Sequence, residues 1–125
     1  MITANYAFPV FTVNDLGTAT DFYHRHFDFT PVFDNGWYVQ LVSTTGIQLA
    51  FLLSEHHSQP AIFKPRYNGE GVIFSLDVAD VDQAWEYARN NDLDIVLELK
   101  SENWGQRHFS IQDPNGILVD IYQPV

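Results

Sequence analysis

Cysteine is absent from this chain of 125 residues. Its absence excludes disulfide bonds, thiolate nucleophiles and zinc sites with cysteine ligands, and it is typical of the cytoplasmic location that we expect. The N-terminal stretch "MITANYAFPVFTVND" lacks a basic segment followed by a long apolar run, so the sequence predicts no signal peptide. No apolar stretch approaches the ~18 residues needed to cross a bilayer, so we expect no membrane partner.

Positive charge is scarce. Six lysine and arginine residues face sixteen aspartate and glutamate residues, and the formal net charge is −10. Because such a surface repels phosphate backbones, we expect no nucleic-acid partner. The same charge attracts cationic small molecules, although it is equally typical of acidic proteins in which charge serves solubility alone.

Several sequence patterns of catalysis are also missing. The chain contains neither G-x-G-x-x-G nor G-x-x-x-x-G-K, the glycine-rich patterns that cradle phosphates. It has no serine in a G-x-S-x-G pattern, which places a nucleophile in many hydrolases. We therefore predict no catalytic residue from motifs. What the chain does have is 46% hydrophobic residues, enough for the core of a single domain spanning residues 1–125.

The sequence repeats itself. "FTVNDLGTATDFYHRHFDF" can be laid over "LDVADVDQAWEYARNNDL" so that Val13 falls on Val78 and Asp15 on Asp80, an offset of 65. Each stretch starts as a strand and then meets an aspartate that can cap a helix. Apolar residues at helical spacing predict helices over residues 15–27 and 80–91.

Short strands separated by turns follow each predicted helix. The turns are "DNG", "STTG" and "DPNG", and the last two occupy the same place in the two halves. The pattern predicts two βαβββ units, residues 4–53 and 72–124, joined by a polar linker over residues 54–71. We expect an α+β fold in which the units lie side by side and form a curved mixed sheet, with helices on its convex face and an open cleft.

These units resemble the vicinal oxygen chelate superfamily, which shares the glyoxalase, bleomycin-resistance and extradiol-dioxygenase fold. The resemblance rests on the paired units, the "TVNDLGTATDFY" entry and the "WGQRHFSIQDPNGILVDIYQ" ending, and the ending is similar to the bleomycin-resistance-like branch. It implies a divalent metal held on the first strand of each unit and on the last strand, at positions occupied here by Phe8, Ile73 and Asp120. Because two of these side chains offer no lone pair, we expect neither a metal nor another cofactor.

Strand alternation predicts which side chains face the cleft. The predicted lining is aromatic and apolar with a few polar groups, as in small-molecule sites, and Trp104 adds a ring that can stack on a ligand. The predicted ligand-binding residues are Phe8, Tyr38, Gln40, Ile73, Ser75, Asp77, Trp104, His108, Ser110, Asp120 and Tyr122.

His108 and Asp120 leave three interpretations open. The histidine contacts a ligand, or it is an acid–base group oriented by Asp120, or it is bonded to neighbouring strand residues. A lone histidine–carboxylate pair without a nucleophile or metal does not decide among them.

The resemblance implies a metal-independent protein that sequesters a drug or metabolite, as in antibiotic resistance, in a cleft at the interface of a homodimer. Asp77, Asp120 and the acidic surface predict a cationic, aromatic ligand. Two alternatives remain. One is a glyoxalase-like lyase, isomerase or dioxygenase with a displaced metal site that uses His108, Asp120 and Asp77. The other is a structural or regulatory dimer without a small ligand.

Overall fold

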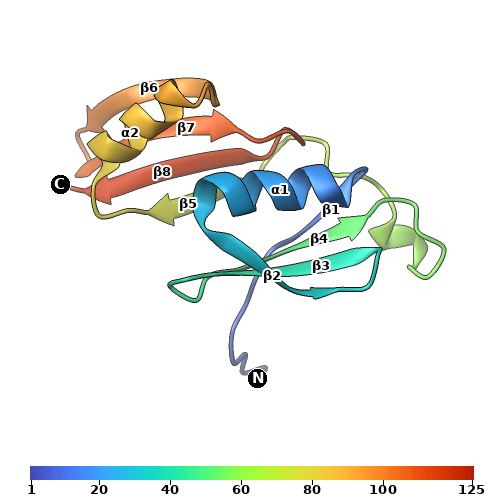
Figure 1. Cartoon of the computed structure of the whole chain (residues 1–125). Helices are drawn as coiled ribbons and strands as arrows, with labels where there is room; N and C mark the ends of the chain where they lie inside the picture. The colour runs from blue at the N-terminus through green and yellow to red at the C-terminus, as the bar shows by residue number, and fades with distance from the viewer. The chain divides into compact units, whose positions relative to one another are not determined.

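The computed structural model describes residues 1–125 and divides the chain into two compact units, Met1–Tyr67 (unit 1) and Asn68–Val125 (unit 2). In each unit one helix covers one face of a four-stranded mixed sheet, which confirms the predicted α+β class and the two βαβββ units (Figure 1). The boundary between the units falls inside the predicted linker. Neither helix is long and apolar enough to cross a membrane.

Unit 1 has the strand order β1-β4-β3-β2, in which β1 runs parallel to β4 and the other pairs are antiparallel. Its helix buries Ala19 and Tyr23 against sheet residues such as Phe11, Leu49 and Phe51. The elements are β1 (Val10–Val13), α1 (Leu16–Phe27), β2 (Phe29–Asp34), β3 (Tyr38–Ser43), β4 (Gln48–Leu53) and the 3₁₀ helix η1 (Ala61–Phe63).

Unit 2 repeats this topology with the order β5-β8-β7-β6. Val81 and Ala88 of its helix are buried, as are Phe109, Val119 and Ile121 of the sheet. Strand alternation would put Val72 on the core side with Phe74 and Leu76, but Val72 is 45% exposed, because β5 begins one residue later. The elements are β5 (Ile73–Asp77), α2 (Val81–Asn90), β6 (Asp94–Glu102), β7 (Gln106–Gln112) and β8 (Leu118–Pro124).

The two units match in their hydrogen bonds as well as in their topology. Asp15 and Asp80 each cap a helix, and each side chain accepts from the backbone N–H three residues later, at 3.1 and 3.0 Å. In the turns before β4 and β8, the N–H of Ser43 donates to Ile47 and the N–H of Asp113 donates to Ile117. Equivalent residues of the two units differ in number by 65 at the helix caps and by 70 at these turns. Unit 2 therefore contains five more residues than unit 1 between the helix cap and the turn.

Replacing either capping aspartate by alanine is expected to lower the free energy of unfolding by about 1 kcal/mol, because each substitution leaves a helix N–H without its acceptor. Urea denaturation of Asp15→Ala and Asp80→Ala measures the two losses. Asp94→Ala is the control, since Asp94 is exposed and caps no helix. Equal stability of all three variants would contradict the capping role.

Candidate functional site

The face of the unit 2 sheet opposite α2 gathers most of the predicted site residues; we call it the open face of unit 2. The strand register pairs Ser75 with Asp120 and pairs Asp120 with Ser110, and residues paired in this way project to the same side. The other side carries the buried residues that contact α2. The open face of unit 2 therefore comprises Ile73, Ser75, Asp77, His108, Ser110, Gln112, Leu118, Asp120 and Tyr122.

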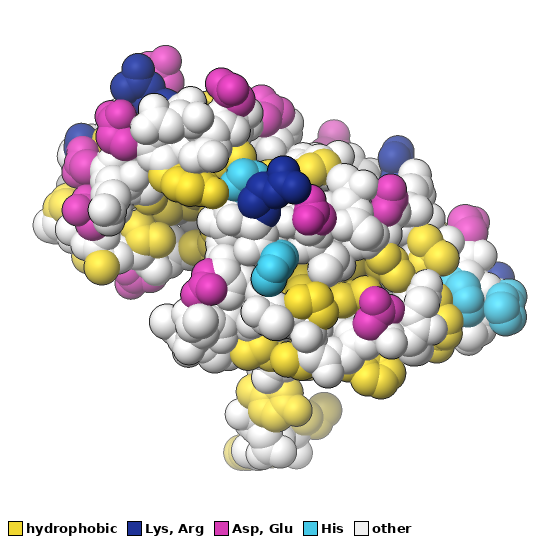
Figure 2. All heavy atoms as spheres, viewed as in Figure 1, with side chains coloured by type: hydrophobic (Ala, Val, Ile, Leu, Met, Phe, Trp, Pro, Cys, Tyr) yellow, Lys and Arg dark blue, Asp and Glu magenta, His cyan; other side chains and the backbone are white.

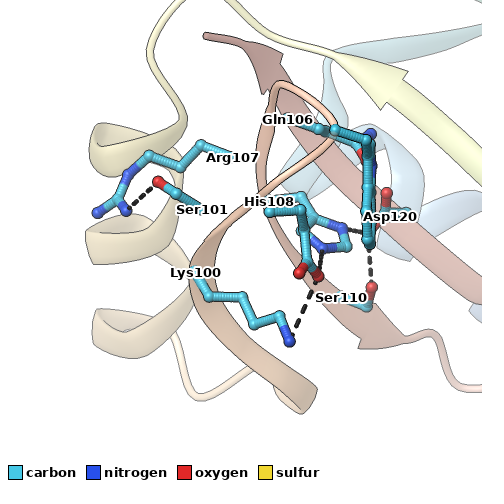
Figure 3. Close-up of polar contacts among 9 residues, drawn as sticks. Lys100, Ser101, Gln106, Arg107, His108, Ser110 and Asp120 are labelled. Atoms are coloured by element: carbon cyan, nitrogen blue, oxygen red, sulfur yellow. Dashed lines mark hydrogen bonds and ion pairs between the residues drawn. The ribbon is translucent and has the colours of Figure 1, made fainter.

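At the centre of this face His108 lies between two carboxylates. Its Nδ1 is 2.7 Å from Asp120 Oδ1, and its Nε2 is 2.8 Å from Glu102 Oε2. The Ser110 hydroxyl donates to the same Asp120 oxygen at 2.7 Å, and Lys100 lies 3.4 Å from Glu102. Figure 3 shows His108 and Asp120 pointing toward each other from β7 and β8. We call Glu102, His108, Asp120 and Ser110 the His108 clamp.

The clamp requires a protonated histidine. Carboxylates only accept hydrogen bonds and a neutral imidazole has one N–H, so two short contacts to carboxylates require the imidazolium. Burial acts to lower the pKa of His108, but hydrogen bonds and attraction from Glu102 and Asp120 outweigh it and raise that pKa. The hydrogen bond from His108 in turn lowers the pKa of Glu102. The clamp itself carries one positive and two negative charges, and the Lys100 ammonium beside Glu102 balances the second negative charge.

The donor set does not fit the metal that the family resemblance implies. Phe8 precedes β1 and Ile73 begins β5, and neither side chain can ligate a metal. The two nitrogens of His108 point to opposite sides of its ring, so Asp120 and Glu102 cannot meet at one ion bound to that ring. No group of three or more histidine, cysteine, aspartate or glutamate side chains in residues 1–125 is arranged to hold a metal ion.

The clamp also offers no nucleophile with a base. Ser110 donates to Asp120 rather than to histidine, and both nitrogens of His108 are occupied. A general base needs a free lone pair within reach of its proton donor. His108 is therefore bonded to its neighbours in this structure, and its contact with a ligand stays a prediction.

Unit 1 contains a separate pocket of about 360 Å³ on its sheet face opposite α1. Of the predicted residues, Tyr38 lines this pocket and donates to Gln40 beside it. Phe8 is not part of the lining; it stacks on Tyr6 with ring centroids 6.4 Å apart. The lining, here called the unit 1 pocket, comprises Val10, Thr12, Trp37, Tyr38, Leu52, Gln59, Ile62, Phe63 and Pro65.

The remaining predicted residues surround the clamp at different depths. Trp104 is 66% exposed, donates to Gln106 and has its ring centroid 6.4 Å from that of His108. Asp77 is exposed and pairs in register with the half-buried Tyr122. These residues border the clamp rather than forming part of its hydrogen-bond network.

Sequence reasoning missed Glu102 and the apolar part of the linker. Lys100 and Glu102 alternate in the strand before His108, but two earlier shifts in the pairing of β6 with β7 hide the side on which they lie. Ile62 and Phe63 lie between Pro60 and Pro65 in a stretch interpreted as polar linker, and they instead form a wall of the unit 1 pocket.

Comparison with protein families matches residues 5–121 to the Glyoxalase/Bleomycin resistance protein/Dioxygenase superfamily. The chain belongs to this superfamily. The match spans both units and confirms the resemblance drawn from the sequence, whereas the bleomycin-resistance-like branch stays a prediction. No curated protein matches the sequence.

Several solved structures share the fold at low sequence identity. A member from Sphaerobacter thermophilus is 24% identical, with a TM-score of 0.77, and the match covers 98% of this chain and 99% of that one. A member from Nocardioides is 16% identical, with a TM-score of 0.79 and coverage of 100% and 87%. TioX from Micromonospora sp. is 19% identical, with a TM-score of 0.76 and coverage of 98% and 100%. These likenesses show a common fold.

Proposed function

We propose that this superfamily member binds a small cationic molecule without a metal, at the open face of unit 2. The observation that supports the proposal is the Asp120 carboxylate of the His108 clamp, which lies on a sheet face that no helix of unit 2 covers. Asp120 accepts the hydrogen bonds from His108 and Ser110 on Oδ1, which leaves Oδ2 as the oxygen that would accept from a ligand N–H.

The surroundings of the clamp favour a cation that carries an aromatic ring. Asp77 adds a negative charge next to Tyr122, and Trp104 and Tyr122 offer ring faces. A cation over an aromatic ring gains about 0.5–2 kcal/mol. In this proposal the protein sequesters a drug or metabolite of this class, as in antibiotic resistance, and acts as a homodimer in the cytoplasm.

The two rival functions receive less support from the geometry. A lyase, isomerase or dioxygenase with a displaced metal site needs converging ligands, and His108, Asp120 and Asp77 do not form such a group. A structural dimer without a ligand leaves the exposed charge of Asp77 and the free oxygen of Asp120 without a role.

Tryptamine, a cationic indole, is expected to bind the open face of unit 2 about tenfold more tightly than neutral indole, because a charged hydrogen bond to a carboxylate contributes about 1.5–3 kcal/mol. Asp120→Asn should remove most of this preference while keeping the shape of the side chain. The measurement is an NMR titration that follows the side-chain N–H of Trp104, after dialysis against EDTA.

Two further variants act as controls for this titration. Glu86→Gln removes an exposed charge of α2, on the opposite side of the sheet from the open face, and it should leave the preference unchanged. Asp77→Asn should also weaken the binding of tryptamine, but by a smaller factor than Asp120→Asn does. Equal binding of tryptamine and indole at Trp104, or binding that appears only after zinc or manganese is added, would refute the proposal.

A further inference from the structure

We infer that unit 1 carries a binding site on its helix side, a groove between α1 and the edge strand β2 that takes a small linear molecule with an ammonium group at each end. The groove lies on the opposite side of the sheet from the unit 1 pocket. Its volume is about 390 Å³, within the roughly 300–1,000 Å³ of cavities that hold small molecules. The lining, here called the α1–β2 groove, comprises Leu16, Gly17, Thr20, Asp21, His24, Pro31, Asp34 and Val39.

A β-bulge directs a carboxylate into this groove. The pairing of β2 with β3 shifts between Pro31 and Phe33, so that Asp34 pairs with Val39, and paired residues project to the same side. Val39 is 3% exposed on the side that α1 covers. Without the shift, alternation from Pro31 would bring Phe33 to this side, but Phe33 pairs with Gln40 on the other face. The bulge thus exchanges an aromatic ring for a negative charge.

Two further side chains of α1 present hydrogen-bonding atoms to the groove. Nδ1 of His24 lies 2.8 Å from the backbone oxygen of Phe29, and because a carbonyl oxygen only accepts, this nitrogen carries the hydrogen. In the neutral ring Nε2 then holds the lone pair that can accept from a ligand. The hydroxyl oxygen of Thr20 is buried and has no hydrogen-bond partner in the chain, a costly state that a ligand N–H would relieve.

The charges of the lining select a cation. Asp21 and Asp34 are its charged residues, and the N–H of Gly36 occupies Oδ1 of Asp34 at 2.8 Å, which leaves Oδ2 to accept from a ligand. Arg25 lies 3.1 Å from Asp21, with side chains that are 66% and 62% exposed. An ion pair this exposed contributes little to stability, so a ligand ammonium can replace the guanidinium. Figure 2 shows a histidine and acidic side chains around hydrophobic ones on the face of unit 1 that α1 covers.

The arrangement of the acceptors favours a ligand with separated donors. These side chains do not form a group that could hold a metal ion, so a single compact cation cannot reach them together. Along α1 the lining runs from Leu16 to His24, a length of about 12 Å at 1.5 Å per residue. Leu16, Pro31 and Val39 add apolar surface that a methylene chain can cover. A linear diamine combines two ammonium groups with such a chain.

Gly17 keeps space in the groove. Alanine would favour the helix at this position, and a Cβ built there would meet only Asp15 Oδ1, at an ordinary contact distance of 3.4 Å. Packing therefore does not require the glycine. Because Gly17 lines the groove, a methyl group at this position would occupy part of the volume that a ligand needs.

Three probes that share a five-carbon chain test the inference: 1,5-diaminopentane, 1-aminopentane and 1-pentanol, with two, one and no ammonium groups. In NMR titrations of the full chain at neutral pH, the diamine should shift the ring Cε1–H signal of His24 in a saturable way. It should bind there about tenfold more tightly than the monoamine, the effect of one additional charged hydrogen bond, and the alcohol should bind most weakly. Asp34→Asn should remove most of the difference between the two amines.

Two variants separate a groove from general attraction to an acidic chain. Glu86→Gln removes an exposed charge of α2 and should leave the titration unchanged. Gly17→Ala should weaken the diamine without lowering the stability measured by urea denaturation, so a loss of folding cannot explain the result. The inference is overturned if the His24 signal shows no saturable shift, if the monoamine binds as tightly as the diamine, if Asp34→Asn and Glu86→Gln have equal effects, or if Gly17→Ala binds the diamine unchanged.

The inference does not depend on the function proposed for unit 2, because it uses different residues. The side-chain N–H of Trp104 reports binding at the open face of unit 2, whereas the His24 signal reports the α1–β2 groove. Asp120→Asn should leave diamine binding at His24 unchanged, so either proposal can fail alone. If Asp120→Asn abolishes the shift of His24, the diamine does not bind in the groove and the inference is wrong.

Discussion

His108→Ala is expected to lower the free energy of unfolding at pH 7 by about 3 kcal/mol, the low end of the range for breaking a buried ion pair by removing one partner. His108 and Asp120 are each 8% exposed, so the variant leaves a carboxylate with little access to water and without its cation. Ser110 still donates to Asp120, and Glu102 is only half-buried, which keeps the loss at this low end. Urea denaturation measures the effect.

A double-mutant cycle distinguishes loss of the charge interactions of the clamp from simple loss of side-chain packing. If the stranded charge of Asp120 causes the loss, adding Asp120→Asn to His108→Ala should restore part of the stability, because the buried group is then neutral. A loss below about 1 kcal/mol, or a double variant as unstable as the sum of the two single variants, would show that the clamp is not a coupled network.

Stability is expected to fall as the pH rises through the pKa of His108 in the folded protein. This pKa is raised above the ordinary value of 6.5, so the folded state holds its proton more tightly than the unfolded state does. The contribution of the clamp is therefore complete below about pH 6.5 and is lost as the pH rises through the higher folded value. Glu102 acts in the opposite sense at low pH, because its pKa is lowered from 4.5 and its contribution is lost as the pH falls through the folded value.

Urea denaturation at a series of pH values between about 5 and 9 tests this expectation, with His108→Ala as the reference. The difference in stability between the native protein and the variant should shrink as the pH rises through the alkaline part of this range. His24→Ala provides a control for histidine titration in general, because Nδ1 of His24 contacts the backbone oxygen of Phe29 and not a carboxylate. A difference that stays constant with pH would mean that His108 is not an imidazolium in the folded protein.

The features that the sequence predicted well depend on local chemistry. Asp15 and Asp80 cap helices because an aspartate before an amphipathic stretch can accept from its N–H groups, and this requires no knowledge of the rest of the chain. The contact of His108 with Asp120 follows from alternation on two strands that a tight turn joins. Both inferences rely on a regular spacing of residues, helical in the first case and alternating in the second, and the chain keeps each spacing without interruption.

Prediction of the site failed where the alternation along a strand is interrupted, or where a contact depends on residues that are distant in the sequence. The pairing of β6 with β7 shifts between Ile95 and Leu97 and again between Leu97 and Lys100, so counting by two along β6 cannot place Glu102 beside His108. Phe8 was assigned to the first strand, but β1 begins after Pro9, which lacks the N–H that a strand donates. The η1 wall depends on bonds from Glu55 to Lys64 and from Tyr67 to Thr12, which no periodicity reveals.

The five additional residues of unit 2 explain how the two units differ. In unit 1 the β2–β3 ladder ends where Asp34 pairs with Val39, whereas in unit 2 the β6–β7 ladder continues to Glu102 and Gln106. The longer hairpin brings a second carboxylate to the ring of His108, while the position equivalent to His108 in unit 1 is Tyr38, beside an uncharged pocket. A repeated architecture can thus acquire chemically unlike halves through a change in hairpin length, with its helices, caps and turns left as they were.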